Sequence, residues 1–147
     1  MRTILLAAPL LLAQAFCQEA ATGSVASLKA LVPGERQEMP LAREGRWVLI
    51  YSSDDSAATQ RLWASLERAG IDASRITQLR PDKDAVRTRS RRSLQLIDPA
   101  GVISAELDLT QTPTLIGLEG SRIVWRVNGI PGNVADLRAL IMRWTKP

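Results

Sequence analysis

Residues 107–129 read LDLTQTPTLIGLEGSRIVWRVNG, and this stretch decides the fold. It contains two apolar runs, 114–118 and 122–127, separated by the turn residues Glu-Gly-Ser. Alternating or continuous apolar runs on either side of a short glycine-containing turn are typical of a β-hairpin. Pro113 stands immediately before the first run, between two threonines. The sequence therefore predicts a hairpin that is entered through a Thr-Pro-Thr turn.

An amphipathic helix is expected after this hairpin. A polar break at Gly129, Pro131 and Gly132 separates the two elements. The apolar residues beyond it recur at helical spacing: Val134, Leu137, Leu140, Ile141 and Trp144. We assign Trp125 and Trp144 to the core between hairpin and helix and not to a ligand site.

Upstream, Arg46 to Tyr51 forms a continuous apolar run, as expected for a central strand covered on both faces. A helix is expected to begin at Asp54 or Asp55 and to end near Ala69, just before a glycine. The remaining elements are a strand at 76–79 parallel to the first, a small strand at 93–97 and a short helix at 102–109. The expected order is βαβ(α)ββα.

This arrangement resembles the thioredoxin-like superfamily: a strand, a loop that opens a helix, and later a Thr-Pro-Thr before a hairpin and a last helix. The resemblance implies an α/β fold with a central mixed sheet of about four strands flanked by helices. It also implies a cis peptide bond between Thr112 and Pro113. In relatives, the backbone before this proline pairs with an extended peptide. Thr112, Pro113 and Tyr51 are therefore the candidate peptide-binding residues.

Redox-active members of this superfamily carry Cys-x-x-Cys where the loop meets the helix. The matching residues here are Ser-Ala-Ala-Thr, so Ser56 and Thr59 occupy degenerate redox positions. The chain has no histidine and one cysteine. That composition excludes Ser-His-Asp and Cys-His nucleophiles, Cys/His zinc sites and internal disulfides. From the sequence we expect no enzyme activity, no cofactor and no metal.

The first residues read as a targeting segment. Residues 1–15 combine an early arginine, a short apolar run and an Ala-Gln-Ala cleavage site, which predicts a signal peptide and a periplasmic protein. Cys17 follows directly, but Phe16 before it departs from lipoprotein signals, so a free thiol is favoured over lipidation. Residues 16–45 are expected to be a tail with a short helix at 24–32, and residues 46–147 the thioredoxin-like domain.

A narrower resemblance concerns conjugation. Leu96-Ile97-Asp98-Pro99 followed by Thr112-Pro113-Thr114 is similar to TrbC-type conjugative pilin-assembly proteins, and the run 47–71 is similar to thioredoxin-like proteins of integrating conjugative elements. The resemblance implies a redox-inactive interaction or assembly factor that binds extended segments of envelope proteins, within a conjugative transfer or secretion apparatus.

Two alternatives remain open. The net charge is +4, and four arginines crowd one stretch: Arg87, Arg89, Arg91 and Arg92. This basic patch suits nucleic acid or an anionic membrane, although no aromatic residue lies between the arginines to stack on bases. The other alternative is an enzyme that uses Ser56 as a nucleophile, with only aspartates or a distant lysine available as base.

Overall fold

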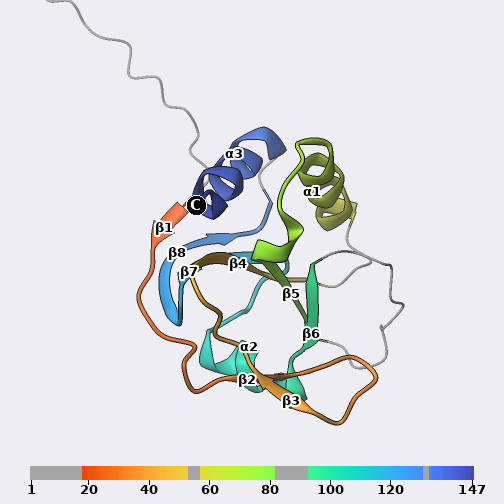
Figure 1. Cartoon of the computed structure of the whole chain (residues 1–147), viewed down its shortest axis with the longest axis vertical. Coiled ribbons are helices and arrows are strands. Elements are labelled where there is room, and N and C mark those ends of the chain that lie inside the picture. Colours follow the sequence, from red (N-terminus) through yellow and green to blue (C-terminus); the bar gives the residue numbers. More distant parts are fainter. Residues whose placement is uncertain (1–17, 53–56, 82–92, 131–132) are drawn as a thin grey trace, which may run out of the picture.

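The structure, a computed structural model, describes residues 18–52, 57–81, 93–130 and 133–147. Within these residues one mixed sheet contains eight strands. Their bounds are β1 Gln18–Ala20, β2 Lys29–Leu31, β3 Glu38–Pro40, β4 Arg46–Tyr51, β5 Ile76–Arg80, β6 Leu94–Ile97, β7 Thr114–Glu119 and β8 Arg122–Asn128. The strand order is β1-β8-β7-β4-β5-β6-β2-β3 (Figure 1).

The centre of the sheet agrees with the sequence. β4, β5 and β6 are parallel neighbours, whereas β7 runs antiparallel to β4 and forms the expected hairpin with β8. All residues of β4 except the first are buried, as are all five of β5. This burial explains why β4 reads as an unbroken apolar run, since both of its faces are covered.

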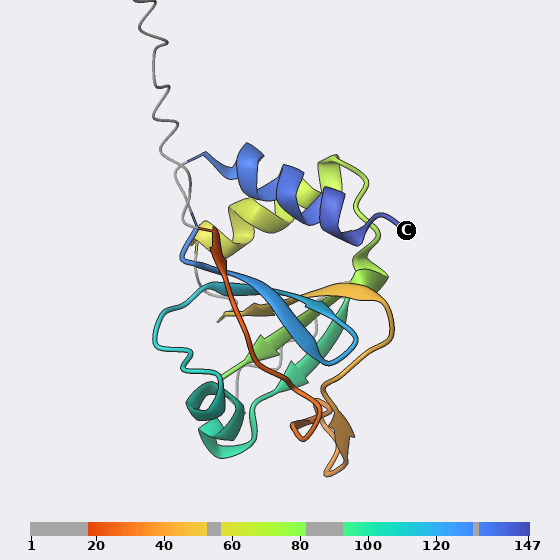
Figure 2. The same ribbon diagram turned by 90° about the vertical axis from the view of Figure 1, so that its left-hand side faces the viewer.

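Two helices cover one face of the sheet, and a smaller layer covers the other (Figure 2). α1 (Ala57–Arg68) and α3 (Val134–Thr145) pack side by side over the first face. Their apolar side chains form one core cluster with Val48 and Ile50 of β4. The second face carries α2 (Val102–Glu106) and the segment 21–42. Both helices and the short α2 confirm the sequence-based assignments, with ends that differ by a few residues.

The expectation of about four strands was wrong, because the sheet has eight: five lie in residues 46–128, and the N-terminal segment adds three more that extend the sheet at both edges. β1 pairs with β8, and the β2–β3 hairpin joins β6 through the Leu31–Ile97 pair. The helix expected at 24–32 is absent; a turn and β2 occupy that range. Leu28 and Ala30 are buried while Lys29 is exposed, so burial there follows the two-residue period of a strand.

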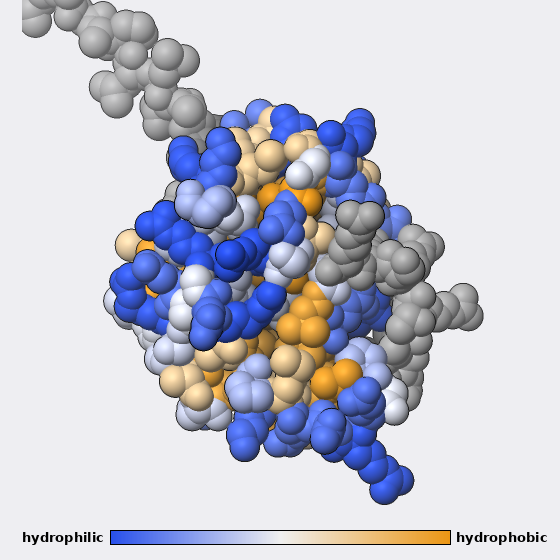
Figure 3. Space-filling view, in the orientation of Figure 1, coloured by the Kyte–Doolittle hydropathy of each residue, from blue (hydrophilic) through white to orange (hydrophobic). Residues whose placement is uncertain are grey.

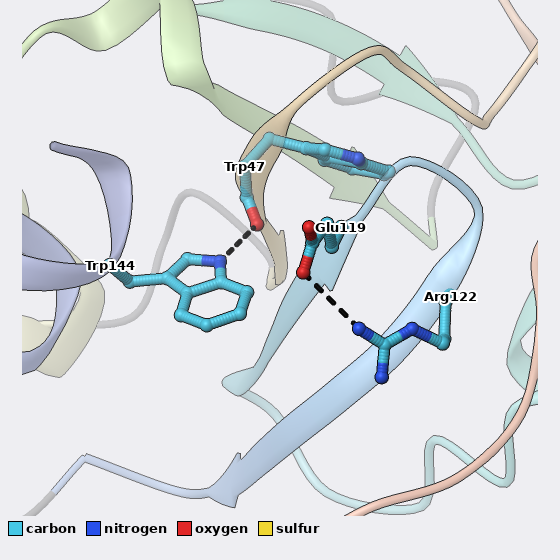
Figure 4. A network of polar contacts seen from close by, with 4 residues as sticks. All are labelled: Trp47, Glu119, Arg122 and Trp144. Carbon is cyan, nitrogen blue, oxygen red and sulfur yellow. Dashed lines mark hydrogen bonds and ion pairs between the residues drawn. The ribbon is translucent and has the colours of Figure 1, made fainter. Parts of the chain in front are cut away.

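Three tryptophans tie the hairpin, β4 and α3 together. The Trp47 indole donates a hydrogen bond to the Gly120 carbonyl at 2.8 Å. The Trp144 indole donates to the Trp47 carbonyl at 3.1 Å (Figure 4). The rings of Trp125 and Trp144 meet edge to face, with centroids 6.1 Å apart. Trp125 is 2% exposed, which confirms its assignment to the core, while Trp144 is only partly buried.

The face of the molecule seen in Figure 3 is largely hydrophilic. In the view of Figure 3, apolar residues reach the surface in a narrow band between hydrophilic regions. Val102 is the one exposed large apolar side chain among the described residues. No helix in the described part of the chain has the length and apolar character needed to cross a bilayer.

The side chain of Trp125 leaves no room for a larger residue at Gly117 of the hairpin. Gly117 lies opposite Trp125 in the β7–β8 register, and a Cβ at position 117 would lie 2.0 Å from Trp125 Cε2. We predict that Gly117→Ala destabilises the fold by about 1–3 kcal/mol through overpacking. Urea unfolding followed by Trp fluorescence measures the change.

Trp125→Phe supplies the matched control for this clash. The smaller ring should relieve part of it, so the double variant should lose less stability than the sum of the two single variants. An unfolding midpoint unchanged by Gly117→Ala would contradict the close packing of this pair.

Candidate functional site

The carboxyl ends of the parallel strands meet at one edge of the sheet. β4 ends at Tyr51, β5 at Arg80 and β6 at Ile97. Since β7 runs antiparallel to β4, its first residue pairs with the last residue of β4, which brings the Thr-Pro-Thr turn to the same edge. Ligands of open α/β sheets bind outside the carboxyl ends of the strands. We call this region the carboxyl edge.

Thr112 is presented at the carboxyl edge by a well-fixed turn. The Thr112–Pro113 bond is cis. Gly129 N–H donates to the Pro113 carbonyl at 2.7 Å, and the Thr114 hydroxyl donates to the Gln111 carbonyl at 2.6 Å. Thr112 is exposed whereas Pro113 is buried. Among the described residues, no backbone hydrogen bond uses the N–H or carbonyl of Thr112. The turn therefore holds an exposed residue with a pairing-competent backbone.

Tyr51 lies beside this turn but points into the core. Its side chain is only 5% exposed and belongs to the apolar cluster on the α2 side of the sheet. Burial raises the pKa of Tyr51, a side-chain hydrogen bond with Ser104 lowers it by less, and the Asp98 carboxylate adds to the increase. Tyr51 therefore packs in the core next to the carboxyl edge. A direct contact between Tyr51 and a ligand at this edge stays a prediction.

Asp98 orders the loop that adjoins Tyr51. It is 1% exposed, and its two carboxylate oxygens accept the N–H groups of Ile103 at 2.8 Å and Ser104 at 2.9 Å. Its own N–H donates to the Arg80 carbonyl at 2.9 Å. A carboxylate that receives the first amides of a helix satisfies donors that otherwise lack partners. Asp98 thus joins the end of β5 to α2.

A second group of buried polar residues lies on the helix side of the carboxyl edge. Ser52, Gln78 and Arg80 are 0–2% exposed, and Gln78 Nε2 donates to the Ser52 hydroxyl at 3.4 Å. Thr59, in the first turn of α1, is 1% exposed. Gln78, Arg80 and Thr59 make further interactions besides these. Buried polar groups are held by hydrogen bonds, so this part of the edge is rigid.

Sequence reasoning singled out only part of this site. It did not identify Gln78, Arg80 and Ser104, and it named Asp98 only within the 96–99 motif, although the three polar residues of the five-residue strand ITQLR indicate buried polar groups. Several predicted residues lie outside the described ranges and stay predictions: Ser56, Cys17, the signal segment 1–15, Arg87, Arg89, Arg91 and Arg92. Thr59 is described, and its burial keeps it from the surface.

A metal site is not apparent in the part of the chain that the structure describes. No three or more Asp, Glu, Cys or His side chains gather there in a group able to hold an ion. At the carboxyl edge, the backbone of the exposed residue Thr112 is the group that the described structure offers for pairing.

Comparison with known proteins identifies the fold. No protein-family model matches the chain, and no curated protein matches its sequence. Solved structures do match. A bacterioferritin comigratory protein from Xanthomonas campestris, described for its alkyl peroxide reduction activity, has a TM-score of 0.63 and 12% identity, covering 86% of this chain and 98% of that one.

Two further matches are oxidoreductases. A secreted disulfide oxidoreductase of Mycobacterium tuberculosis has a TM-score of 0.59 and 15% identity over 78% of this chain and 93% of its own. The thioredoxin domain of a thiol-disulfide oxidoreductase from Bacteroides vulgatus has a TM-score of 0.59 and 13% identity, over 87% and 100% respectively. The chain therefore has a thioredoxin-like α/β fold, as the sequence predicted.

These matches correct the expectation that the chain is not an enzyme. The three solved structures are all described as redox proteins with enzymatic activity. The expectation was drawn from the missing Cys-x-x-Cys pair and the lack of histidine. Its error was to treat the loss of one motif as the loss of every activity that this fold carries.

Tyr51 gives a direct test of the carboxyl edge, because it is the only tyrosine in the chain. Absorbance of the tyrosinate therefore reports this one group. We predict a higher apparent pKa in the native protein than in urea, since burial is the largest cause of the shift. The contribution of Tyr51 to stability should be complete below about pH 10 and should be lost as the pH rises through the folded-state pKa.

A Ser104→Ala variant is the control for the opposing hydrogen bond. Removing that bond should raise the pKa of Tyr51 further, because it lowers the pKa in the wild-type protein. Identical native and unfolded titration curves would show that Tyr51 is solvated and would contradict the packing of the carboxyl edge.

Proposed function

We propose that this protein is an exported thioredoxin-like protein that binds extended segments of envelope proteins at the carboxyl edge. The observation that carries this proposal is the exposure of Thr112 on a fixed turn, with a backbone that pairs with no other described residue. An extended peptide binds such a backbone by adding main-chain hydrogen bonds, while nearby side chains select its sequence.

Export and an assembly role are part of the same proposal. The signal-like segment 1–15 supports export, as does the likeness in fold to a secreted disulfide oxidoreductase. The setting that we propose is a conjugative transfer or secretion apparatus. It is supported by the sequence motifs at 96–99 and 112–114.

Site-specific crosslinking tests the peptide-binding edge. A photoreactive benzoylphenylalanine at position 112 should capture discrete envelope proteins, and mass spectrometry should map the crosslinks to extended segments of them. The same residue at position 36, which is exposed on the β2–β3 turn, is the matched control. Capture of the same proteins from both positions, or of nothing from position 112, would contradict the proposal.

A second candidate function is thiol–disulfide exchange through Cys17. It is favoured by the oxidoreductases that share the fold. Because Cys17 is the only cysteine in the chain, exchange must proceed through a mixed disulfide with a second molecule.

Insulin reduction with dithiothreitol measures this activity. We expect the wild-type protein to accelerate turbidity and Cys17→Ser to return the rate to that of dithiothreitol alone, since the serine hydroxyl cannot form the mixed disulfide. Ser56→Ala should leave the rate unchanged. A wild-type rate equal to the background would remove thiol exchange and leave the peptide-binding proposal untouched.

A further inference from the structure

Two hollows adjoin at the end of β4 opposite the carboxyl edge. The larger has a volume of about 500 Å³, with an apolar wall of Val124, Trp125, Leu140 and Trp144, and Arg46 and Arg143 beside it. The smaller has a volume of about 390 Å³ and includes Arg46, Arg75 and Lys146. Because Arg46 lines both, they form one surface, which we call the arginine groove.

Arg46 is held in the groove by an aromatic ring. Its guanidinium carbon lies 4.7 Å from the centroid of Trp144, a cation–π contact. Trp144 is itself fixed, because its indole donates to the Trp47 carbonyl. The guanidinium therefore keeps its place without an acidic partner.

The carboxylate nearest to Arg46 in the sheet register is already engaged. Glu119 is the cross-strand neighbour of Arg46 on β7. Its Oε2, however, accepts from Arg122 Nη2 at 3.2 Å (Figure 4). Across the described residues, neither Arg46 nor Arg143 has a carboxylate within 4.0 Å. Arg46 and Arg143 thus lie beside an apolar wall with no ion-pair partner among the described residues.

No acidic side chain lines either hollow. Of the cations that line the groove, Arg75 interacts with an acidic side chain, that of Asp72. Hydrogen bonds from Ser74 lower the pKa of Asp72, with smaller contributions from Arg75 and Arg43, so this carboxylate stays charged beside Arg75. The other charged side chains that line the groove are all cationic: Arg46, Arg143 and Lys146. Its charge and its apolar wall together fit an anionic ligand that also carries an apolar group.

We propose that the arginine groove docks an acidic segment of a partner protein that carries an apolar side chain among its carboxylates. The carboxylates accept hydrogen bonds from Arg46 and Arg143, and the apolar side chain packs against Ala20 and Val124, which are accessible at the wall of the groove. Two adjoining open hollows suit an extended chain better than a compact small molecule, which favours an enclosed pocket.

A membrane or a nucleic acid fits this surface less well. Bilayer binding by a soluble domain uses exposed aromatic or aliphatic side chains. In the described residues only Val102 is an exposed large apolar residue, and it lies on α2, away from the groove. Single-stranded nucleic acid needs exposed rings for base stacking, whereas Trp125 is 2% exposed and Trp144 already faces Arg46.

The groove goes beyond the peptide-binding edge proposed above and is separate from it. Arg46 begins β4 and Tyr51 ends it, so the two surfaces lie about 17 Å apart at about 3.3 Å per residue. A partner that reaches both surfaces gains avidity, because the second contact forms at a high effective concentration.

Fluorescence anisotropy tests the groove with the full chain. The probe is a fluorescein-labelled peptide of glutamates interspersed with leucine and phenylalanine. We expect Arg46→Gln and Arg143→Gln each to weaken binding about tenfold, the usual effect of losing a charge-assisted hydrogen bond. Arg36→Gln changes the net charge equally at the exposed β2–β3 turn and should leave binding unchanged.

Three outcomes would overturn the proposal. The wild-type protein could fail to bind the probe, or Arg36→Gln could weaken binding as much as the groove variants, which would indicate general charge attraction. Third, the wild-type protein could bind phosphatidylglycerol vesicles but not the peptide, and the groove variants could lose the vesicle binding. That result would assign the groove to membranes. A Thr112→Trp variant should retain peptide binding in the groove, so failure of the carboxyl edge and failure of the groove are distinguishable.

Discussion

Burial of β4 on both faces is the constraint on which the rest of the structure depends. Each residue from Trp47 to Tyr51 is at most 5% exposed, with β5 on one side and β7 on the other. A strand in this position has all of its backbone groups paired and its side chains in two separate cores. Its two ends are the only parts that approach the surface. Both candidate sites are found there, the carboxyl edge at one end and the arginine groove at the other.

The two ends of β4 differ in whether their polar groups are buried or exposed. At the carboxyl edge, buried polar side chains form two groups: Ser52, Gln78 and Arg80 in one, and Asp98, which accepts the Ser104 backbone N–H, in the other. Such buried groups are rigid, because each would be costly to leave without a partner. At the other end the charged groups are exposed, and a tryptophan holds one of them by ring stacking. The first end is suited to backbone pairing and the second to charge complementarity.

Hydrogen bonds to carbonyls link the tryptophans to these ends. Trp47 reaches the turn of the β7–β8 hairpin, and Trp144 reaches the backbone of β4. α3 and the hairpin are thereby held against the same strand. Solved structures with the same fold belong to proteins that are described as redox enzymes. In this chain the cysteine pair is missing from the framework, and one cysteine precedes it.

Much of the fold could be predicted from the sequence, because the signals are local. The apolar run of β4, the hairpin around Gly120, the helical spacing of α3 and the Thr-Pro-Thr turn each follow from residues close together in the chain. The turn also pointed to Thr112, which the structure places at the surface. Composition alone established that the chain has no histidine and a single cysteine.

Only the tertiary structure decided the remaining features, since they depend on which distant segments become neighbours. Residues 24–32 have helical spacing, yet pairing with β3 and β6 makes part of that range a strand. Tyr51 ends an apolar run, and α2 then buries it. Arg46 and Trp144 are far apart in the sequence, and nothing local shows that they stack or that Glu119 turns to Arg122. Local periodicity specifies elements, whereas packing between elements decides what each side chain meets.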